Sequence, residues 1–401
     1  MADYSRKETA VRAGVPIGFM DRLVELGVLV PGAGDRFSAG DARRAGTVQT
    51  LEASGIPVQD VADTLKSGAL SLSFLDSPIY ERFAPYTAET FADLSARTGV
   101  PVELLAIIRE AMGAALPSPT DFVREDELAI VPFLEMQVAN GFQPIATERL
   151  LRVHGDSLRR MAETESGWWR SEVIAPGLAA GKSPEEAVNP DYTEELTRRL
   201  GQSVLAIYGA QQAHAWTANI IDGFVLALER AGLSTRLDHP PAMCFLDITG
   251  YTRLTQERGD AAAAELAGTL SRLVQRTSIA HAGRPVKWLG DGVMFIFPEP
   301  GSGVAAALEM VAGVADAGLP PAHVGLHAGP VIFQDGDFFG QTVNVASRIA
   351  EYARPGEVLV TQAVVDSAAQ AGTTGVGFTD IGPVELKGVA GALHLLAAHR
   401  A

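Results

Sequence analysis

The sequence has one cysteine, no long apolar segment and little positive charge, and each of these absences excludes a class of protein. Its single cysteine, Cys244, cannot form an intrachain disulfide, which is typical of proteins from a reducing compartment. No run of about 18 apolar residues occurs, so no transmembrane helix is expected. Residues 1–9 lack the apolar stretch of a signal peptide. We therefore expect a cytoplasmic protein.

Acidic residues outnumber basic ones, 48 Asp and Glu against 32 Lys and Arg, and the formal net charge is −16. This charge argues against broad binding to nucleic acids or to anionic membranes. With 401 residues, of which 47% are hydrophobic, the chain can form two or three domains with buried cores.

Two stretches each place an aspartate at the end of an apolar, strand-like run. Asp247 ends the first run, and residues 286–289 lead into Gly290-Asp291-Gly292. Gly-Asp-Gly between two β-rich runs predicts a tight hairpin with Asp291 at its tip. A strand that ends beside this hairpin would bring both carboxylates to one rim. Such a pair suits Mg²⁺, which is usually held by one or two carboxylates and substrate phosphates, as in two-metal phosphoryl transfer.

A third stretch, residues 335–349, indicates a glycine-punctuated loop that enters a helix. Asn344 and Arg348 are four residues apart, so they share one helical face. The first offers an amide, and the second offers a permanent planar cation that matches phosphate.

Together these stretches resemble the catalytic domain of the class III nucleotidyl cyclases over roughly residues 238–398. The resemblance assigns each candidate residue a role. Two Mg²⁺ or Mn²⁺ ions would be held by Asp247, Asp291 and the main chain of Ile248, and the adenine edge would be recognised by Lys287 and Asp337. The ribose would be oriented, and charge on the phosphates neutralised, by Asn344 and Arg348. The terminal phosphates would be contacted by Lys387, as by a late lysine in some family members.

The resemblance also implies a reaction. Guanine-using relatives have an acid and a small polar residue at the positions of Lys287 and Asp337, whereas a donor followed by an acceptor complements adenine. The implied activity is an adenylate cyclase that converts ATP to 3′,5′-cyclic AMP and pyrophosphate. A homodimer with two shared sites is also implied: one chain would supply the two aspartates, and its partner would supply the adenine and transition-state pairs.

Each of these residues also has an ordinary structural explanation. An aspartate after an apolar run is commonly a turn or strand-end acid, and Lys287 alone would be a solvated lysine. Asn344 and Arg348 alone would be a surface hydrogen-bond former and an ion-pair partner. The order and spacing of the whole set favour the site over these separate explanations.

Residues 236–401 alternate strand-like and helix-like patterns in the order β-α-β-β-α-β, which predicts an α+β, ferredoxin-like sheet. The expected strands include residues 242–247, 323–328, 357–361 and 391–401, and the expected helices include residues 261–280 and 303–317.

The N-terminal half is expected to be all-helical. Residues 1–70 resemble the winged helix-turn-helix of MerR-type regulators, with a short turn or wing at residues 34–37. Residues 71–235 are expected to form a helical regulatory or transducer domain, with a helical hairpin at 87–113. A Gly-hydrophobic-Pro motif at 14–16, 55–57 and 99–101 is expected to open helices, with proline in the first turn.

DNA binding is one possible role for the first module. Residues 1–70 contain eight Lys or Arg and nine Asp or Glu, so they lack the basic footprint of a DNA-binding domain. Arg36, Arg43 and Arg44 form a small basic cluster. The composition favours a protein-packing role, and the alternative function is a DNA-binding regulator whose cyclase-like domain senses a nucleotide.

A long helix, residues 193–231, is expected to join the helical half to the first catalytic strand and so to transmit a regulatory signal. His154 and His214 titrate near neutrality if unperturbed and are candidate pH sensors, although ordinary half-buried helix histidines explain them as well. A small apolar ligand between the helices is the other candidate input. Trp168, Trp169 and Trp216 are expected as core anchors.

Overall fold

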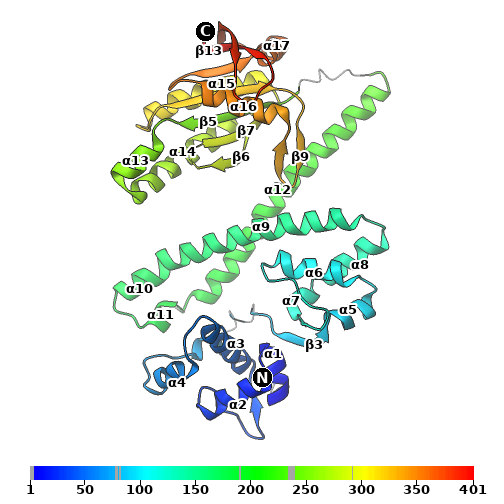
Figure 1. The fold of residues 1–401 in the computed structure, drawn as a ribbon, viewed down its shortest axis with the longest axis vertical. Helices are drawn as coiled ribbons and strands as arrows, with labels where there is room; N and C mark the ends of the chain where they lie inside the picture. The colour runs from blue at the N-terminus through cyan, green and yellow to red at the C-terminus, as the bar shows by residue number, and fades with distance from the viewer. Residues whose placement is uncertain (1–3, 77–79, 81–82, 189–190, 234–239, 291) are drawn as a thin grey trace. The chain divides into compact units, whose positions relative to one another are not determined.

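The structure is a computed structural model that describes residues 4–401 apart from 77–79, 81–82, 189–190, 234–239 and 291. The chain divides into two compact units, Met1–Ile221 and Asp222–Ala401 (Figure 1). The boundary falls inside the long helix α12 (Thr193–Arg230). Over the described residues, no helix combines the length and apolarity needed to cross a membrane.

The first module of the N-terminal unit packs four short helices around a core that includes Met20, Leu23 and Phe37. Its elements are β1 (Tyr4–Ser5), α1 (Arg6–Ala13), α2 (Ile17–Glu25), β2 (Arg36–Phe37), α3 (Ala39–Ala53), α4 (Val58–Lys66) and the 3-10 turn η1 (Ser73–Asp76). The predicted wing is a short strand, because β2 pairs antiparallel with β1.

The Gly-hydrophobic-Pro motif separates consecutive helices. Gly14 and Gly99 end their helices in the left-handed conformation, with φ of 70° and 72°. Pro16, Pro57 and Pro101 are the N-caps of the helices that follow, one position before the first turn in which they were expected. A rigid φ suits this boundary, since proline cannot continue the preceding helix.

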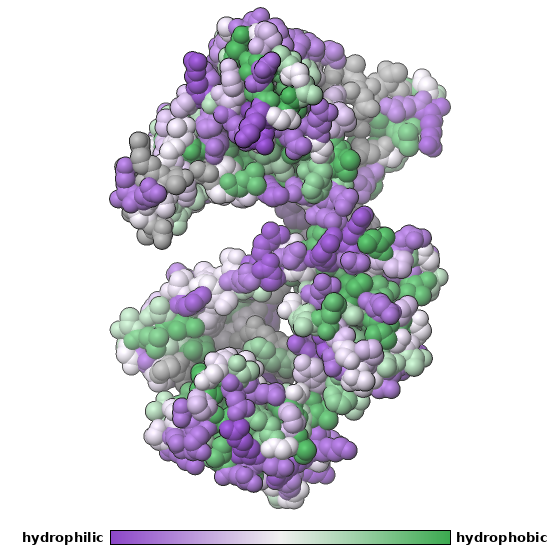
Figure 2. Space-filling view, viewed as in Figure 1, coloured by the Kyte–Doolittle hydropathy of each residue, from purple (hydrophilic) through white to green (hydrophobic). Residues whose placement is uncertain are grey.

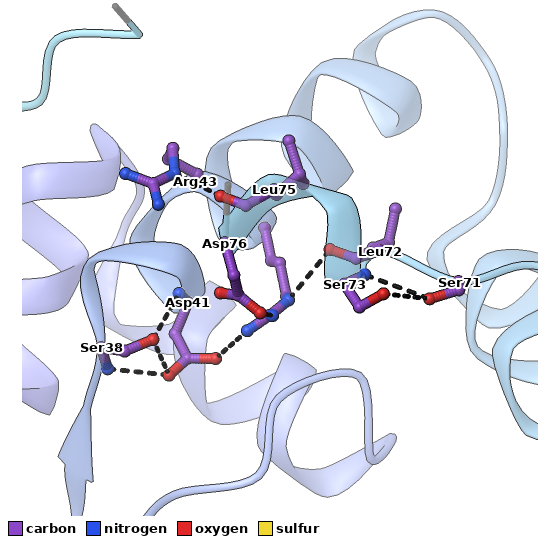
Figure 3. A network of polar contacts seen from close by, with 9 residues as sticks. Ser38, Asp41, Arg43, Ser71, Leu72, Ser73, Leu75 and Asp76 are labelled. Atoms are coloured by element: carbon purple, nitrogen blue, oxygen red, sulfur yellow. Dashed lines mark hydrogen bonds and ion pairs between the residues drawn. The ribbon is translucent and has the colours of Figure 1, made fainter. Parts of the chain in front are cut away.

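Two arginines of the small basic cluster, Arg43 and Arg44, contact their own chain near η1 (Figure 3). Arg43 Nε donates to the carbonyl of Leu75 at 2.6 Å. Arg44 contacts Asp41 at 2.7 Å and also pairs with Asp76. These contacts join η1 to α3, so both guanidinium groups stabilise the packing of the module.

A second module follows, and its core includes Phe91, Leu105 and Leu134. Its elements are β3 (Tyr86–Thr90), α5 (Phe91–Thr98), α6 (Val102–Ala111), β4 (Phe122–Arg124), α7 (Glu125–Leu128) and α8 (Val131–Ala139). Helices α5 and α6 form the expected hairpin. Strands β3 and β4 pair antiparallel, so the N-terminal half is mainly helical and also contains short strands that the sequence did not predict.

An ion pair lies inside this second module. Arg109 Nε is 2.5 Å from Glu127 Oε1, and the two side chains are only 10% and 2% exposed. Glu127 Oε2 accepts from Arg109 Nη2 at 2.8 Å and from the backbone N–H of Arg124 at 2.7 Å. The Arg109 guanidinium carbon lies 4.7 Å from the centroid of the Phe91 ring. The pair therefore ties α6, β4 and α7 together.

We expect Arg109→Met to lower the free energy of unfolding by about 3 kcal/mol, because it leaves Glu127 buried without its counter-charge. The double variant Arg109→Met with Glu127→Gln should recover most of this loss. Urea unfolding, followed by circular dichroism, measures both. Arg97→Met is the matched control: it breaks a pair whose arginine is 56% exposed, and it should cost less than about 1 kcal/mol. Equal losses in the two single variants would contradict the assignment.

The remaining elements of the N-terminal unit, over its described residues, are helices. They are α9 (Pro144–Trp169), a π-helical turn (Arg170–Ile174), α10 (Ala175–Ala179), α11 (Pro184–Val188) and α12. Helix α12 matches the predicted long helix within one residue. Trp168 and Trp216 are 44% and 64% exposed, so the prediction that they anchor a core is wrong. His154 and His214 are exposed and not half-buried.

The C-terminal unit is built on a seven-stranded sheet with the order β12-β13-β11-β8-β5-β7-β6. The strands are β5 (Ala242–Ile248), β6 (Arg284–Leu289), β7 (Gly292–Phe297), β8 (Ala322–Ala328), β11 (Val358–Thr361), β12 (Val376–Glu385) and β13 (Ala392–Arg400). Only β11 and β8 pair in parallel within this sheet. The predicted β-α-β-β-α-β order is present in the first four of these strands and the helices between them. Strand β12 was not predicted.

Helices cover both faces of this sheet (Figure 1). The helices are α13 (Tyr251–Arg258), α14 (Asp260–Ala280), α15 (Pro300–Asp316), α16 (Gln341–Tyr352) and α17 (Gln362–Gln370). Side chains alternate along β5: Cys244 and Leu246 enter the core under α14 and α15, whereas Met243 and Phe245 pack with Ala346 of α16. Cys244 is thus a core residue, and burial raises the pKa of its thiol.

A small hairpin follows β8 and had been expected only as a loop. Strands β9 (Ile332–Gln334) and β10 (Asp337–Phe339) pair antiparallel around Asp335-Gly336. Both turn residues have positive φ, 56° and 81°, which is the geometry that Asp-Gly favours in two-residue hairpins. The hairpin presents Asp337 at the start of β10.

Candidate nucleotide site

Asp247 lies near the end of β5, the strand between β8 and β7. The residues before it are buried, whereas the Asp247 side chain is 46% exposed. Alternation along β5 places Asp247 on the same face as Met243 and Phe245, the face that α16 covers. The strand therefore runs through the core and places the carboxylate of Asp247 at the rim of the sheet, as predicted.

The predicted hairpin is present, since β6 and β7 pair antiparallel with Leu289 opposite Gly292. Gly292 is also directly opposite Asp247 on the other neighbour of β7. A Cβ on Gly292 would lie 3.3 Å from Asp247 Oδ1, so the carboxylate is beside the residue that follows Asp291. Asp291 itself lies outside the described residues.

Lys287 and Asp337, the expected adenine pair, contact each other within one chain. Lys287 Nζ donates to Asp337 Oδ2 at 2.8 Å, and the side chains are 50% and 23% exposed. Asp337 Oδ1 accepts the backbone N–H of Phe338 at 2.9 Å. This second bond orients the carboxylate, so a donor and an acceptor are held side by side at an accessible edge.

Helix α16 lies close against the sheet because Gly325 of β8 has no side chain. A Cβ at Gly325 would be 2.2 Å from the backbone nitrogen of Ala350. The buried residues of the helix, which include Val345 and Ile349, face the sheet. Asn344 and Arg348 lie on the opposite, accessible side of α16, on one face as predicted.

Arg348 is held by a neighbour that the sequence did not single out. Arg348 Nη1 lies 2.5 Å from both carboxylate oxygens of Glu351. The two side chains are 41% and 57% exposed, so this is a solvent-accessible ion pair of small net stability. A phosphate group could therefore replace Glu351 at little cost.

The two remaining site residues are near these groups in the fold. Ile248 is the last residue of β5 and is buried. Lys387 is exposed in the β12–β13 connection, and the adjacent Leu386 packs in a cluster with Val345 and Ile349 of α16.

His323 is a neighbour of Asp247 that sequence reasoning missed. It is opposite Asp247 in the β5–β8 register and is only 12% exposed. Its Nε2 lies 3.7 Å from Asp247 Oδ2, and its Nδ1 is 3.2 Å from Thr249 Oγ1. Strand β8 had been predicted, but its partner and register could not be inferred from a single sequence. Two residues after Gly325, His327 is partly buried, and burial lowers its pKa.

The residues present fit a hard divalent cation. The described residues contain no cluster of three or more His, Cys, Asp or Glu side chains that could hold a metal. Mg²⁺ does not need such a cluster, because one or two carboxylates and substrate phosphates are sufficient. The carboxylate of Asp247 is half-exposed and so accessible to a cation, and the adjacent Gly292 has no side chain that could cover it.

Comparison with known proteins identifies the C-terminal unit. Residues 238–397 match the family described as the adenylate and guanylate cyclase catalytic domain. A pH-sensitive adenylate cyclase of Mycobacterium tuberculosis is 28% identical over 320 residues, covering 77% of this chain and 77% of the relative. An adenylate cyclase of Streptomyces coelicolor is 27% identical over 314 residues, covering 77% and 78%. Both alignments are longer than the catalytic segment, so they extend into the N-terminal unit.

Among solved structures, an adenylate/guanylate cyclase/hydrolase from Silicibacter pomeroyi is similar at 25% identity, with a TM-score of 0.36. The match covers 40% of this chain and 96% of that one. The segment that matches the family contains Asp247, Lys287 and Arg348. Residues 238–397 therefore form a class III nucleotidyl cyclase domain, in a chain whose actinobacterial homologues include named adenylate cyclases.

Proposed function

We propose that this protein is an adenylate cyclase that converts ATP to 3′,5′-cyclic AMP and pyrophosphate. The observation that carries the choice of ATP is the Lys287–Asp337 pair at 2.8 Å. An ammonium donor beside a carboxylate acceptor complements the adjacent acceptor nitrogen and amino group of adenine. Guanine presents the reverse pattern at that edge, so it would leave the polar groups of this pair unmatched. The mismatch weakens binding of GTP and so favours ATP.

The proposed reaction forms one bond and breaks one. The ribose 3′-oxygen attacks the α-phosphorus, the bond from that phosphorus to the bridging oxygen of the β-phosphate breaks, and the 3′-hydroxyl proton goes to solvent. Asn344 orients the ribose, and Arg348 leaves Glu351 to neutralise charge on the transferring group. Lys387 is assigned to the terminal phosphates.

Asp247, Asp291 and the main chain of Ile248 are the groups assigned to two Mg²⁺ or Mn²⁺ ions. When bound, such ions would lower the pKa of the 3′-hydroxyl and neutralise the triphosphate. The register of Asp247 with Gly292, the residue that follows Asp291, supports this assignment.

Purified protein should form cyclic AMP and pyrophosphate from ATP with Mg²⁺ or Mn²⁺. We expect Asp247→Ala to reduce the rate by at least about 10²-fold, and to weaken Mn²⁺ binding measured by electron paramagnetic resonance with a non-reacting ATP analogue. Asp316→Ala, which removes an exposed aspartate at the end of α15, is the control and should behave as wild type. Substantial cyclisation by a folded Asp247→Ala protein would refute the metal assignment.

We also propose that the active sites are shared between two chains of a homodimer. Asn344 and Arg348 lie on the side of α16 that faces away from the sheet, whereas Asp247 is on the sheet itself. This arrangement suits a site in which the metal-binding aspartates of one chain lie next to Asn344 and Arg348 of the other chain. A twofold axis then generates two equivalent sites.

The exposed surface of α12 supports a second copy as partner. Between Leu200 and Ile221 the helix carries no Asp, Glu, Lys or Arg. It nevertheless exposes large hydrophobic side chains, including Leu205 at 70% and Trp216 at 64%. Hydrophobic residues also come to the surface elsewhere in both units (Figure 2). A helix that exposes many large hydrophobic side chains and no charge is normally covered by another helix.

A row of residues spaced by seven identifies one seam on α12: Ile207, His214, Ile221 and Leu228. This spacing is typical of coiled coils, and in a parallel pair a polar layer such as that at His214 specifies register. Parallel pairing would bring the C-terminal ends of two α12 helices together. The two catalytic domains that follow them in sequence would then start from the same end of the pair.

Disulfide trapping tests this seam. In a Cys244→Ala background, His214→Cys and Ile221→Cys should each form disulfide-linked dimers on mild oxidation, because residues across a parallel seam come within disulfide range. Gln212→Cys and Asn219→Cys, which are also seven apart but lie on the opposite face, should stay monomeric in denaturing electrophoresis. Equal trapping of both rows, or of neither, would contradict the proposed pairing.

The domain division that we propose is 1–70, 71–235 and 236–401, with the first module resembling a MerR-type winged helix and the last sheet having a ferredoxin-like core. The β8-β5-β7-β6 strand order supports the ferredoxin-like assignment.

Regulation is assigned to the helical half through α12, with protonation of His154 or His214 as one candidate input. A hollow of about 1090 Å³ between α9 and α12, lined largely by apolar groups such as Trp169 and Leu196, suits an apolar ligand as the other.

A DNA-binding regulator that senses a nucleotide is the second candidate function. Its support is the resemblance of residues 1–70 to a helix-turn-helix. The hydrogen bonds of Arg43 and Arg44 to their own chain count against it, since phosphate contacts need available cations. A gel shift with promoter DNA separates it from the cyclase proposal.

A further inference from the structure

Strand β6 carries a second cation that contacts the β9–β10 hairpin. Lys287 bonds to Asp337 at the start of β10. Three residues earlier, the guanidinium carbon of Arg284 lies 5.8 Å from the centroid of the Phe333 ring and 5.4 Å from that of Phe338. The two ring centroids are 4.9 Å apart. Arg284 thus contacts one aromatic side chain from each strand of the hairpin.

The hairpin depends on a small number of such contacts. It has two strands of three residues each, and isolated two-stranded hairpins are marginally stable in water. Phe338 is buried with Met243 and Ala346, but Phe333 and Phe339 are 58% and 48% exposed. The stack on Arg284 therefore fixes the outer side of the hairpin, where burial contributes little.

We propose that Arg284 is a positioning residue for purine recognition: it holds the hairpin that carries Asp337 against the strand that carries Lys287. The proposal rests on the proposed use of ATP and on the Lys287–Asp337 pair as its adenine contact. Arg284 does not touch the substrate in this account. It sets the separation of the donor and the acceptor that do.

The expected effect is modest and specific. An exposed cation–π contact changes an equilibrium by about two- to fivefold, so Arg284→Ala should raise KM for ATP by that factor. The ATP-over-GTP ratio of kcat/KM should fall by a similar factor, because a displaced Asp337 no longer discriminates between the two bases. The value of kcat should change less, since Asp247, Asn344 and Arg348 are on other elements.

The experiment compares Arg284→Ala with Arg284→Lys and with Arg276→Ala. Lysine keeps a cation over the rings but loses the planar stack, so it should restore selectivity in part. Arg276 is an exposed arginine of α14, and its removal should change neither KM nor selectivity. Hydrogen–deuterium exchange of residues 332–339 provides a readout that needs no catalysis, and it should be faster in Arg284→Ala than in the other two variants.

Four outcomes are distinguishable. Raised KM, reduced selectivity and faster hairpin exchange in Arg284→Ala would support the proposal. Faster exchange with unchanged selectivity would show that Arg284 is structural only, and unchanged exchange would show that it does not hold the hairpin; either result overturns the proposal. Failure of the wild-type protein to cyclise ATP would instead refute the proposed function, and the exchange measurement would still test the contact.

Discussion

Strand β5 lies between β8 and β7, with helices packed on both faces, so its backbone and most of its side chains have a fixed environment. This close packing ends at Asp247, where the strand reaches the rim of the sheet and the side chain is half-exposed. Because Gly292 and His323 are opposite Asp247 on the two neighbouring strands, the carboxylate is placed by sheet register and not by a loop. Catalytic groups placed on rigid elements keep their geometry within the narrow limits that phosphoryl transfer requires.

The same sheet positions the other groups through close approach. Gly325 allows the backbone of α16 to lie against β8. This contact sets the distance between the sheet and the helix that carries Asn344 and Arg348. Lys287 is on β6, an edge strand of the sheet. Its partner Asp337 is on the β9–β10 hairpin, which lies outside the sheet. The proposed adenine pair is therefore complete within one chain. Asp247 of the proposed metal site and the proposed transition-state pair, Asn344 and Arg348, lie on different surfaces of that chain.

Much of this arrangement could be predicted from sequence, because the strongest signals are local. The apolar run before Asp247 and the Gly-Asp-Gly turn predicted a strand and a hairpin, and both are present. The four-residue spacing of Asn344 and Arg348 predicted one helical face. Asp335-Gly336 is an equally local hairpin signal, and it was overlooked because the glycines nearby also suit a loop.

What could not be predicted depends on contacts between distant residues. The position of His323 beside Asp247 requires the β5–β8 register, and the stack of Arg284 on Phe333 requires the fold of a hairpin some fifty residues away in sequence. Exposure was misjudged on α12, where Trp216 was expected in a core. The hydrophobic residues of an uncharged helix do not indicate, from sequence alone, whether the partner that covers them is in the same chain.

The central claim is that each active site combines the metal aspartates of one chain with Arg348 of another, and mixed dimers test it most directly. Asp247→Ala and Arg348→Ala chains, each inactive alone, should regain activity when co-expressed, because one of the two sites in a heterodimer carries neither substitution. Random pairing predicts about a quarter of the wild-type rate. No recovery in a preparation whose heterodimers are demonstrated by two affinity tags would contradict the account.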